Sequence, residues 1–438
     1  MVFHINKSKT HPMLISKLAS AFLIIVFLII SCERSTIKTP QEAMRLVENP
    51  PVLSDDLPLS DLAAAIQQKI DRLKEIEDNQ IIFGPKTIDK NDFILSLKFL
   101  EVKIRSGISK DQFNNLVRNN FDFYEVYGKK NWGEVLITSY YEPVLDGSLI
   151  KSANFSQPLY SVPGDLVTIH LNKFVDTFER LSPIKDEVLD NHTNIKIIRG
   201  RVSPPYVEGS SSNVVPYYTR KEIDIDKKLQ GRGLELAWVD PIGAFFLHIQ
   251  GSGSVLFEDG SRLRLGYASQ NGYPFFAIGR HLLDTISKEK MSMQSIEQYL
   301  RSLPEDEMRD ILNLNQRYIF FRKLDSKPIT SFGTEVVEGR TIATDRRFFP
   351  KGTLAFLEFK KPVFESPDSL HPSSWQDTSR FVLDHDTGGA IKGPHRVDLF
   401  WGTGKQAGQS AGVMKQWGKL YYLVPKESLL QKFKSNTH

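Results

Sequence analysis

Residues 383–404 read LDHDTGGAIKGPHRVDLFWGTG, and this stretch predicts two strands that carry acidic side chains. The apolar run just before it predicts a strand that ends near Asp386. Residues 396–400 predict a second strand, with Asp398 inside it. A carboxyl group among buried neighbours is costly unless it is paired or protonated. An acid in this setting is therefore a candidate for proton transfer.

The turn between the two predicted strands contains Gly388 and Gly389. Glycine has no side chain to clash, so the pair allows a tight turn or the close approach of a ligand. For a single aspartate in such a loop, the alternative role is structural, with the carboxylate accepting hydrogen bonds from backbone N–H groups. The surrounding motifs favour the catalytic role.

Three aspartates and their flanking residues resemble the C-terminal three-aspartate region of the membrane-bound lytic transglycosylase A family, whose members cleave bacterial peptidoglycan. These are Asp345 in ATDRRFFPKGT, Asp386 in DTGGAIKG and Asp398 in HRVDLFWG. The resemblance places the single catalytic acid and base of the family on Asp398. It implies that Asp386 and Asp345 line or support the same groove, and all three are candidate catalytic residues.

Composition limits the class of protein. The chain has 438 residues, of which 40% are hydrophobic and 25% are charged, as expected for two or three globular domains. The formal net charge is only +4, and the basic residues are spread along the sequence. The sequence therefore indicates no nucleic-acid partner.

The N-terminus has the pattern of a secretory signal. Several lysines precede the apolar run AFLIIVFLII at residues 21–30, which is too short to span a bilayer as a stable helix. The only cysteine, Cys32, follows it, and IISC resembles the cleavage box of bacterial lipoproteins. We expect a signal peptide at residues 1–31 and a lipid-modified Cys32, with an ordinary signal peptide or an uncleaved anchor as the alternative. Glu33 points to the outer membrane, facing the periplasm.

The next part of the chain predicts a tether followed by helices. Residues 32–59 are largely polar and contain four prolines, which is typical of a linker between a lipid and a folded part. Helical spacing of apolar residues begins at Ser60 and recurs at residues 93–100 and 109–117. We expect three helices that pack against the catalytic domain.

A strand is predicted within residues 134–148, EVLITSYYEPVLDGS, with Tyr140 and Tyr141 at its exit. Paired tyrosines are more often core residues, but aromatic faces also stack on sugar rings, so both are candidates for the groove. Residues 144–322 contain many short β-like runs with turn signals between them. They predict a mostly β domain.

Four segments of that domain resemble motifs of the same family. In WVDPIGAFFLHIQGSGSVLFEDG, residues 238–260, we expect the apolar run to be a strand that leads into the glycine-rich QGSG. Glycines there admit a glycan to the backbone, and the polar side chains offer hydrogen bonds. Asn271 is a turn residue by its own pattern and a sugar contact by resemblance. The candidate substrate-binding residues are Tyr140, Tyr141, Gln250, Gly251, Ser252, Gly253, Asn271, Gly388 and Gly389.

The resemblance implies a mostly β fold with accessory α-helices. Residues 60–143 and 323–438 would form a double-psi β-barrel catalytic domain with the predicted helices. Residues 144–322 would form a second, barrel-like β domain that is inserted into the first and binds glycan. Clefts between domains are preferred binding sites, so the groove between the two would hold the glycan strand.

The implied reaction is the cleavage of the β-1,4 bond between N-acetylmuramic acid and N-acetylglucosamine, which leaves a 1,6-anhydromuramic end. The resemblance implies no cofactor and no metal, and the histidines near acids show no local metal-binding spacing. The implied partners are peptidoglycan strands, the membrane through the lipid, and the machinery of cell-wall synthesis or division. Two alternatives stay open: a polysaccharide hydrolase in the same groove, and a non-catalytic wall-binding protein on the same fold.

Overall fold

The computed structural model describes residues 37–128, 132–189, 197–204, 209, 211–326 and 328–435. The predicted signal peptide and Cys32 lie outside the described residues. The chain divides into a unit that ends at Lys38 and a compact unit, Thr39–His438, and the fold below is that of the second unit. In the described part of the chain, no helix is both long and apolar enough to cross a membrane.

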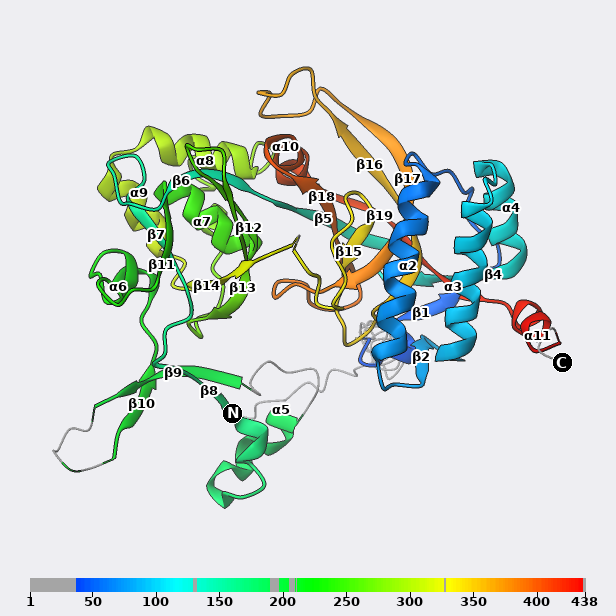
Figure 1. Ribbon diagram of the computed structural model, residues 1–438, viewed down its shortest axis with the longest axis horizontal. Coiled ribbons are helices and arrows are strands. Elements are labelled where there is room, and N and C mark those ends of the chain that lie inside the picture. The colour runs from blue at the N-terminus through cyan, green and yellow to red at the C-terminus, as the bar shows by residue number, and fades with distance from the viewer. Residues whose placement is uncertain are drawn as a thin grey trace, which may run out of the picture. The chain divides into compact units, whose positions relative to one another are not determined.

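Three helices precede most of the strands, as the apolar spacing predicts. They are α2 (Leu59–Glu75), α3 (Lys90–Arg105) and α4 (Lys110–Asn120), with a small hairpin of β2 (Gln80–Phe83) and β3 (Lys86–Asp89) between α2 and α3. A capping box of Ser109 and Gln112 begins α4. Helix α2 instead follows Pro58 and has no side-chain cap. Figure 1 shows α2 and α3 side by side, with α2 against β17.

The largest sheet has eight strands in the order β1-β4-β19-β16-β17-β15-β18-β5. Their bounds are β1 (Met44–Leu46), β4 (Phe121–Val126), β5 (Glu134–Glu142), β15 (Thr341–Ala343), β16 (Thr353–Val363), β17 (Ser374–Asp386), β18 (Arg396–Thr403) and β19 (Lys415–Pro425). The first half of β19 also pairs with β5, which joins six of the strands into a closed ring. A mostly β fold with helices and a closed barrel is thereby confirmed, while the double-psi crossing stays a prediction.

A second sheet has six strands in the order β14-β13-β12-β6-β11-β7. Their bounds are β6 (Val144–Ser148), β7 (Gln157–Tyr160), β11 (Glu235–Val239), β12 (Gly253–Leu256), β13 (Arg262–Gln270) and β14 (Ile319–Leu324). A single bridge from Ser161 to Phe321 connects the two outer strands. The predicted domain boundaries at residues 143 and 323 remain a prediction, although the strand pairing changes close to both.

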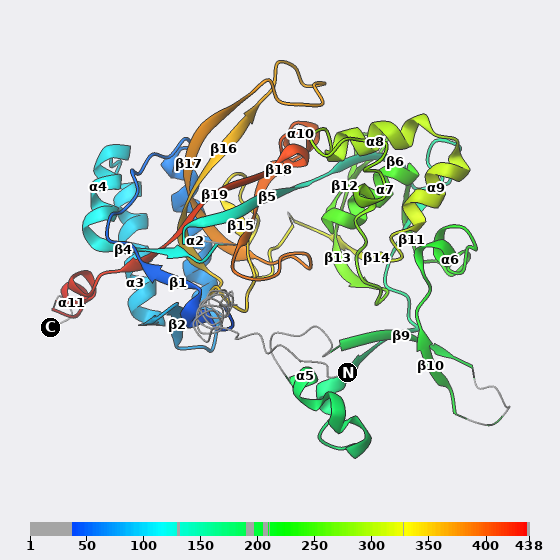
Figure 2. The ribbon, with the colours of Figure 1, turned by 180° about the vertical axis from the view of Figure 1, so that it is seen from behind.

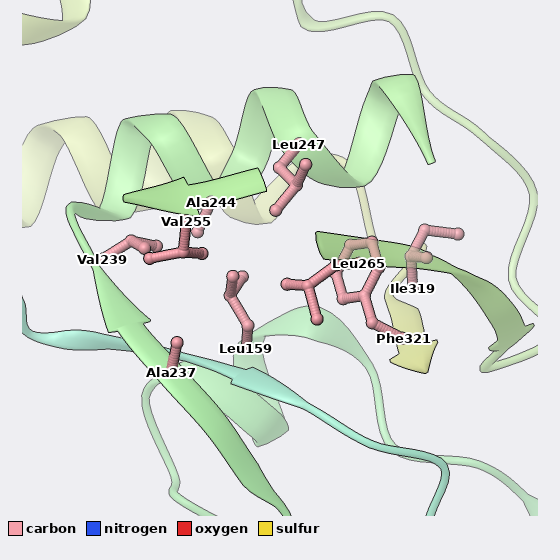
Figure 3. Packing of buried hydrophobic residues seen from close by; sticks show 9 residues of the cluster. All are labelled: Leu159, Ala237, Val239, Ala244, Leu247, Val255, Leu265, Ile319 and Phe321. Atoms are coloured by element: carbon pink, nitrogen blue, oxygen red, sulfur yellow. The ribbon is translucent and has the colours of Figure 1, made fainter. Parts of the chain in front are cut away.

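The second sheet wraps a hydrophobic core. Figure 3 shows nine buried side chains from β7, β11, α7 (Pro241–Gln250), β12, β13 and β14 that point toward one another. None of them is more than 4% exposed: Leu159, Ala237, Val239, Ala244, Leu247, Val255, Leu265, Ile319 and Phe321. Replacing a fully buried leucine here by alanine typically costs about 2–5 kcal/mol. This core therefore fixes the end of α7, which leads into the site.

The apolar run before QGSG is a helix, and the predicted strand is wrong. Helix α7 (Pro241–Gln250) starts after Asp240, whose carboxylate accepts hydrogen bonds from the N–H groups of Ile242 and Gly243. Proline in the first turn and Gly251 in the left-handed conformation (φ 81°) after the last turn complete its start and stop signals. A run that is apolar on every side has no periodicity, so these end signals alone distinguish the helix from a strand.

The remaining elements lie mainly in residues 144–322 and at the C-terminus. They are β8 (Leu166–His170), β9 (Ile197–Ser203) and β10 (Asn213–Pro216) in a three-stranded sheet, α5 (Lys185–Leu189), α6 (Arg220–Asp224), α8 (Met293–Ser302), α9 (Glu305–Asn313), α10 (Lys405–Val413) and α11 (Glu427–Ser435), with 3-10 turns at Pro40–Glu42, Leu171–Lys173, Glu179–Ile184 and Ile278–Arg280. Figure 2 shows α8 and α10 on neighbouring parts of the structure.

The segment after Lys38 is part of the fold, so the predicted tether to residue 59 is wrong over this range. Strand β1 pairs with β4 at the edge of the barrel sheet. Asp55 forms a buried ion pair with Arg340, and both side chains are at most 2% exposed. Asp56 accepts hydrogen bonds from Arg380 on β17. These contacts hold the segment along the barrel.

Candidate functional site

Asp386 and Asp398 lie at the same level of the barrel. Ala343 of β15 pairs with Asp386 of β17 on one side and with Asp398 of β18 on the other. Asp398 in turn pairs with Thr138 of β5. Adjacent strands lie about 4.8 Å apart, so the backbones of the two aspartates are about 10 Å apart, with only Ala343 between them. The predicted proximity of these two acids is therefore present in the fold.

Asp386 is held by uncharged donors. Its Oδ1 accepts hydrogen bonds from the N–H groups of Ser331 (3.0 Å) and Thr387 (2.9 Å), and its Oδ2 accepts one from the Tyr140 hydroxyl (3.0 Å). Burial, followed by Asp386 and then Asp398, raises the pKa of Tyr140 well above its usual range. Tyr140 is therefore a neutral hydrogen-bond donor that extends from β5 toward the acids.

Asp398 is held by a cation. The Nε of Arg396 donates to Oδ1 at 2.9 Å, its Nη2 donates to Oδ2 at 3.1 Å, and the Thr138 hydroxyl donates to Oδ1 as well. The Nη1 of Arg396 reaches the carbonyl of Ala390 at 3.0 Å. Arg396 thus connects Asp398 to the glycine-rich loop between β17 and β18. The sequence places the two residues at i and i+2 of a strand, and side chains at that spacing share a face.

Asp345 lies two residues beyond β15 and connects two loops. Its carboxylate accepts hydrogen bonds from Arg347 and, at 2.8 Å, from the N–H of Gly393. Burial raises the pKa of Asp345, but the bonds from Arg347 and Gly393 outweigh it and leave the pKa below its usual range. An ion-paired carboxylate of this kind braces the loop after Asp386 and is a poor proton donor.

A cavity of about 660 Å³ lies beside Asp386. Five of the predicted site residues line it together with Asp386: Gln250, Gly251, Ser252, Gly388 and Gly389. They come from the end of α7 and from the loop after β17, segments that are more than 130 residues apart in the sequence. The structure therefore brings the QGSG and DTGG motifs to one cavity.

Gln250 has a structural contact as well as a position on the cavity. Its side-chain oxygen accepts a hydrogen bond from the N–H of Tyr141 at 3.3 Å, which connects α7 to β5. Gly253 does not line the cavity. A Cβ atom there would lie 2.4 Å from Leu247 and 2.8 Å from the carbonyl oxygen of Pro143, so glycine is required for packing. Neither Gly388 nor Gly389 has a positive φ. A Cβ atom at Gly388 would lie 3.0 Å from the Ile391 side chain, whereas one at Gly389 would have only the Arg317 guanidinium nearby, at 3.8 Å.

Two other predicted contacts lie away from the cavity. Asn271 is only 1% exposed: its amide donates to the carbonyls of Tyr218 and Gln316 and accepts from the N–H of Tyr318. Its hydrogen-bonding groups are occupied inside the protein, so its assignment as a sugar contact is wrong. Tyr141 packs against Gly408 of α10, on the opposite face of β5 from Tyr140. Burial, then Glu297, raises the pKa of Tyr141 to about 12.

A buried polar cluster that the sequence did not predict lies next to the acids. Asp384 is fully buried and accepts hydrogen bonds from Lys351 (2.6 Å), Thr344 (2.6 Å) and Tyr422 (2.5 Å). Burial raises the pKa of Asp384, although Lys351 opposes the effect. The sequence does not reveal this cluster because the partners of Asp384 come from other segments of the chain, Lys351 and Thr344 from the loop before β16 and Tyr422 from β19.

Two histidines of the region, His248 and His385, are buried and neutral. Burial, then Arg220, lowers the pKa of His248 well below its usual range. Burial, then Lys69 and Lys351, does the same to His385. Nδ1 of His248 faces the Arg220 guanidinium at 3.1 Å, so it acts as an acceptor. Within the residues that the structure describes, no group of three or more His, Cys, Asp or Glu side chains could hold a metal ion.

Two protein-family models match this chain. The MltA specific insert domain matches residues 136–322, which contain QGSG, and the 3D domain matches residues 340–424, which contain Asp345, Asp386 and Asp398. The two matched segments supply most of the residues that line the cavity, and the other lining residues, within 324–331, lie between them.

Named proteins and solved structures are also similar to this chain over most of its length. The membrane-bound lytic murein transglycosylase A of Escherichia coli strain K12 is 26% identical over 313 residues, which are 70% of this chain and 71% of that protein. A crystal structure of the membrane-bound lytic murein transglycosylase from Agrobacterium tumefaciens is 28% identical with a TM-score of 0.67, and covers 89% of this chain and 99% of that one. A crystal structure of E. coli MltA with bound chitohexaose shares the fold at 22% identity, with a TM-score of 0.64 over 89% and 96% of the two chains.

Proposed function

Because the chain belongs to the membrane-bound lytic murein transglycosylase A family, we propose that it is a lytic transglycosylase that cleaves peptidoglycan. The observation that carries the proposal is the pair of acids in one row of the barrel, Asp386 and Asp398, beside a cavity that the inserted segment completes. A sugar chain in this cavity would lie next to Asp386, and Asp398, which does not line the cavity, lies across Ala343 from Asp386 in the same row of the barrel.

Asp398 is the proposed acid and base. In its protonated form it gives its proton to the oxygen of the β-1,4 bond between N-acetylmuramic acid and N-acetylglucosamine, and that bond breaks. The muramic ring becomes oxocarbenium-like. The carboxylate then takes the proton of the 6-hydroxyl of the same ring, and this oxygen bonds to the anomeric carbon. The product is a 1,6-anhydromuramic end, and no water is consumed.

The internal nucleophile explains why a second catalytic carboxylate is not needed. Glycosidases that use water or a covalent intermediate require two carboxyl groups. Here the attacking hydroxyl and the anomeric carbon belong to one ring, so proximity replaces the second group. We assign Asp386 and Tyr140 to the orientation of the sugar, and Asp345 to the support of the glycine-rich loop, on the basis of their hydrogen-bond partners.

The Arg396 guanidinium donates hydrogen bonds to both carboxylate oxygens of Asp398. Arg396 also reaches Ala390 in the loop that lines the cavity, so a bound sugar that shifts this loop would move the guanidinium as well. The proposed enzyme is a carbon–oxygen lyase that acts on a polysaccharide. Its proposed fold is a double-psi β-barrel with an inserted β domain.

The proposed location is the cell envelope. The apolar run before Cys32 and the position of the only cysteine support a lipoprotein anchored in the outer membrane and facing the periplasm. Peptidoglycan is then within reach of the folded part, and the proposed role is wall turnover and remodelling. Proteins of wall synthesis or division are the proposed partners.

Mass spectrometry of digested peptidoglycan tests the reaction. The wild-type protein should release products that end in 1,6-anhydromuramic acid, each lighter by one water than the corresponding reducing end. Asp398→Asn should reduce the rate by about 10²–10⁴-fold, because asparagine cannot donate and then accept a proton. Its binding of glycan and its melting temperature should stay close to wild type.

Other products would support another function. Reducing ends would identify a hydrolase, with Asp386 as the second carboxylate. Binding of peptidoglycan without any cleavage by the folded wild-type protein would identify a wall-binding protein.

A further inference from the structure

Two arginines line the cavity without an anionic partner. Arg317 precedes β14, and Arg322 lies within it. Among the described residues, neither guanidinium forms an ion pair with a carboxylate, in contrast to Arg220, Arg347 and Arg396. Arg220, the third cation of the cavity, is fully engaged with Asp224 and with backbone carbonyls. Arg317 and Arg322 are therefore the cations of this cavity that are available to a ligand.

Arg317 lies against the loop that follows Asp386. A Cβ atom at Gly389 would be 3.8 Å from its Nη2 and 3.9 Å from its Nη1, which places the guanidinium beside the glycine turn. Burial lowers the pKa of Arg317, and the nearby Arg199 lowers it further. Removing a cation from water next to a second cation is unfavourable unless an anion compensates. No carboxylate that the structure describes compensates the charge of Arg317, so an anionic group of a ligand would do so.

Asp386 is the only acid among the residues that line the cavity in the described part of the chain, and three hydrogen bonds already satisfy it. The cavity is thus positively charged near Arg317 and Arg322. N-acetylglucosamine carries no charge. N-acetylmuramic acid carries a lactyl group that ends in a carboxylate. When a peptide is attached to the lactyl group, the free carboxylates of the peptide carry the negative charge instead. A guanidinium matches a carboxylate with two parallel hydrogen bonds.

We propose that Arg317 and Arg322 bind a carboxylate of the muramic side arm and so distinguish peptidoglycan from uncharged glycans. This inference rests on the proposed function, because it assumes that a peptidoglycan strand occupies the cavity. Arg317, next to the glycine turn, would hold the carboxylate of the sugar nearest to Asp386. Arg322, which is more exposed, would meet the same side arm at the entrance or the next one along the strand.

Binding by three ligands tests the proposal, measured by calorimetry in the full chain with Asp398→Asn to prevent cleavage. The ligands are chitohexaose, which is uncharged; glycan strands without peptides, with a free lactyl carboxylate; and strands that carry peptides. Arg317→Gln and Arg322→Gln should each weaken binding of an anionic strand by about 10- to 100-fold, as expected for a charge-assisted bond. They should leave chitohexaose binding unchanged.

The matched control is Lys323→Gln. Lys323 is an exposed cation on the same strand that does not line the cavity, and its replacement should change none of the three affinities. The affinity for anionic strands should also fall with added salt in the parent protein and fall less in Arg317→Gln. A loss for peptide-free strands identifies the lactyl carboxylate as the group bound, and a loss only for peptide-bearing strands identifies the peptide.

Equal losses for chitohexaose and for the anionic strands, or no loss for any ligand, would overturn the proposal. Melting temperatures of the variants show whether an equal loss reflects poor folding. The binding measurement does not depend on the product of the reaction. If the wild-type protein released reducing ends while the arginine variants still lost only anionic ligands, the carboxylate site would stand and the transglycosylase assignment would fail.

Discussion

Asp398 and Arg396 illustrate how a single neighbour fixes the orientation of an acid. The guanidinium contacts both carboxylate oxygens and also reaches the loop that borders the cavity. The pair was readable in HRVDLFWG, because residues at i and i+2 of a strand share a face. The hydrogen bond from Tyr140 to Asp386 could not be predicted from the sequence, because it joins residues that are 246 positions apart. Asn271 was misassigned because its Asn-Gly pattern says nothing about which partners its amide finds.

Arg396→Gln should lower the rate of anhydro-product formation by about 10- to 100-fold. The Asp398 carboxylate would lose both hydrogen bonds from the guanidinium, so its side chain would no longer be held in one orientation. The measurement is the rate of anhydro-product formation by the folded variant. Arg396→Lys is the matched variant: it keeps a positive charge but lacks the fork that reaches both carboxylate oxygens, so its rate should also fall. A wild-type rate in Arg396→Gln would show that Arg396 does not position Asp398 for the reaction.

At the scale of elements, the sequence predicts segments with a clear period and fails where the period is absent. Helices α2, α3 and α4 follow from apolar spacing, and β17 and β18 follow from short apolar runs around the acids. Helix α7 has no polar face, so its pattern fits a buried strand equally well. In the sequence, the segment before α2 looks like a linker. Its contacts, such as that of Asp55 with Arg340, join residues 285 positions apart, and local sequence patterns do not show them.

Truncation separates the ordered segment from the rest of the N-terminus. A chain that starts at Thr39 should fold with wild-type stability, whereas one that starts at Leu57 should lose about 3–5 kcal/mol or more. The shorter chain leaves Arg340 buried without Asp55, and removing one partner of a buried pair costs about that much. Urea unfolding of both chains measures the difference.

Point variants in the chain that starts at Thr39 isolate the ion pair. Asp55→Asn should reproduce much of the loss. Asp377→Asn is the control, because Asp377 is 90% exposed and its surface pair with Lys360 contributes little. If the chain that starts at Leu57 unfolded at the same urea concentration as the longer one, the segment would be a tether after all.

For the whole molecule, buried neutral histidines couple folding to pH. The pKa values of His248 and His385 are lowered in the folded protein, whereas an unfolded histidine titrates near pH 6.5. Above that pH both states are unprotonated, and the histidines add no pH dependence. Below it the unfolded chain takes up protons that the folded chain does not, so the free energy of unfolding falls as the pH falls. The lowered pKa of Asp345 acts only at more acidic pH, below about 4.

Between about pH 6.5 and 5, each of these histidines should reduce the free energy of unfolding by about 1.4 kcal/mol per pH unit. His385→Gln should therefore make the slope shallower by about that amount, whatever its effect on stability at neutral pH. Urea unfolding at several pH values gives the slope. His371→Gln, at an exposed position, should leave it unchanged. Identical slopes for the wild type and His385→Gln would mean that His385 is protonated in the folded protein.

The pairing of β5 with β18 and β19 has a consequence for the time at which the molecule can form. Strand β5 ends at Glu142, and β19, which closes the ring, ends about 280 residues later at Pro425. At about 5–20 residues per second, a ribosome needs roughly 15–60 s to make that stretch. During this interval β6 to β14 can already pair with one another, while β5 has open edges that invite pairing with other chains. The moment of barrel closure is therefore set by the release of the last strand.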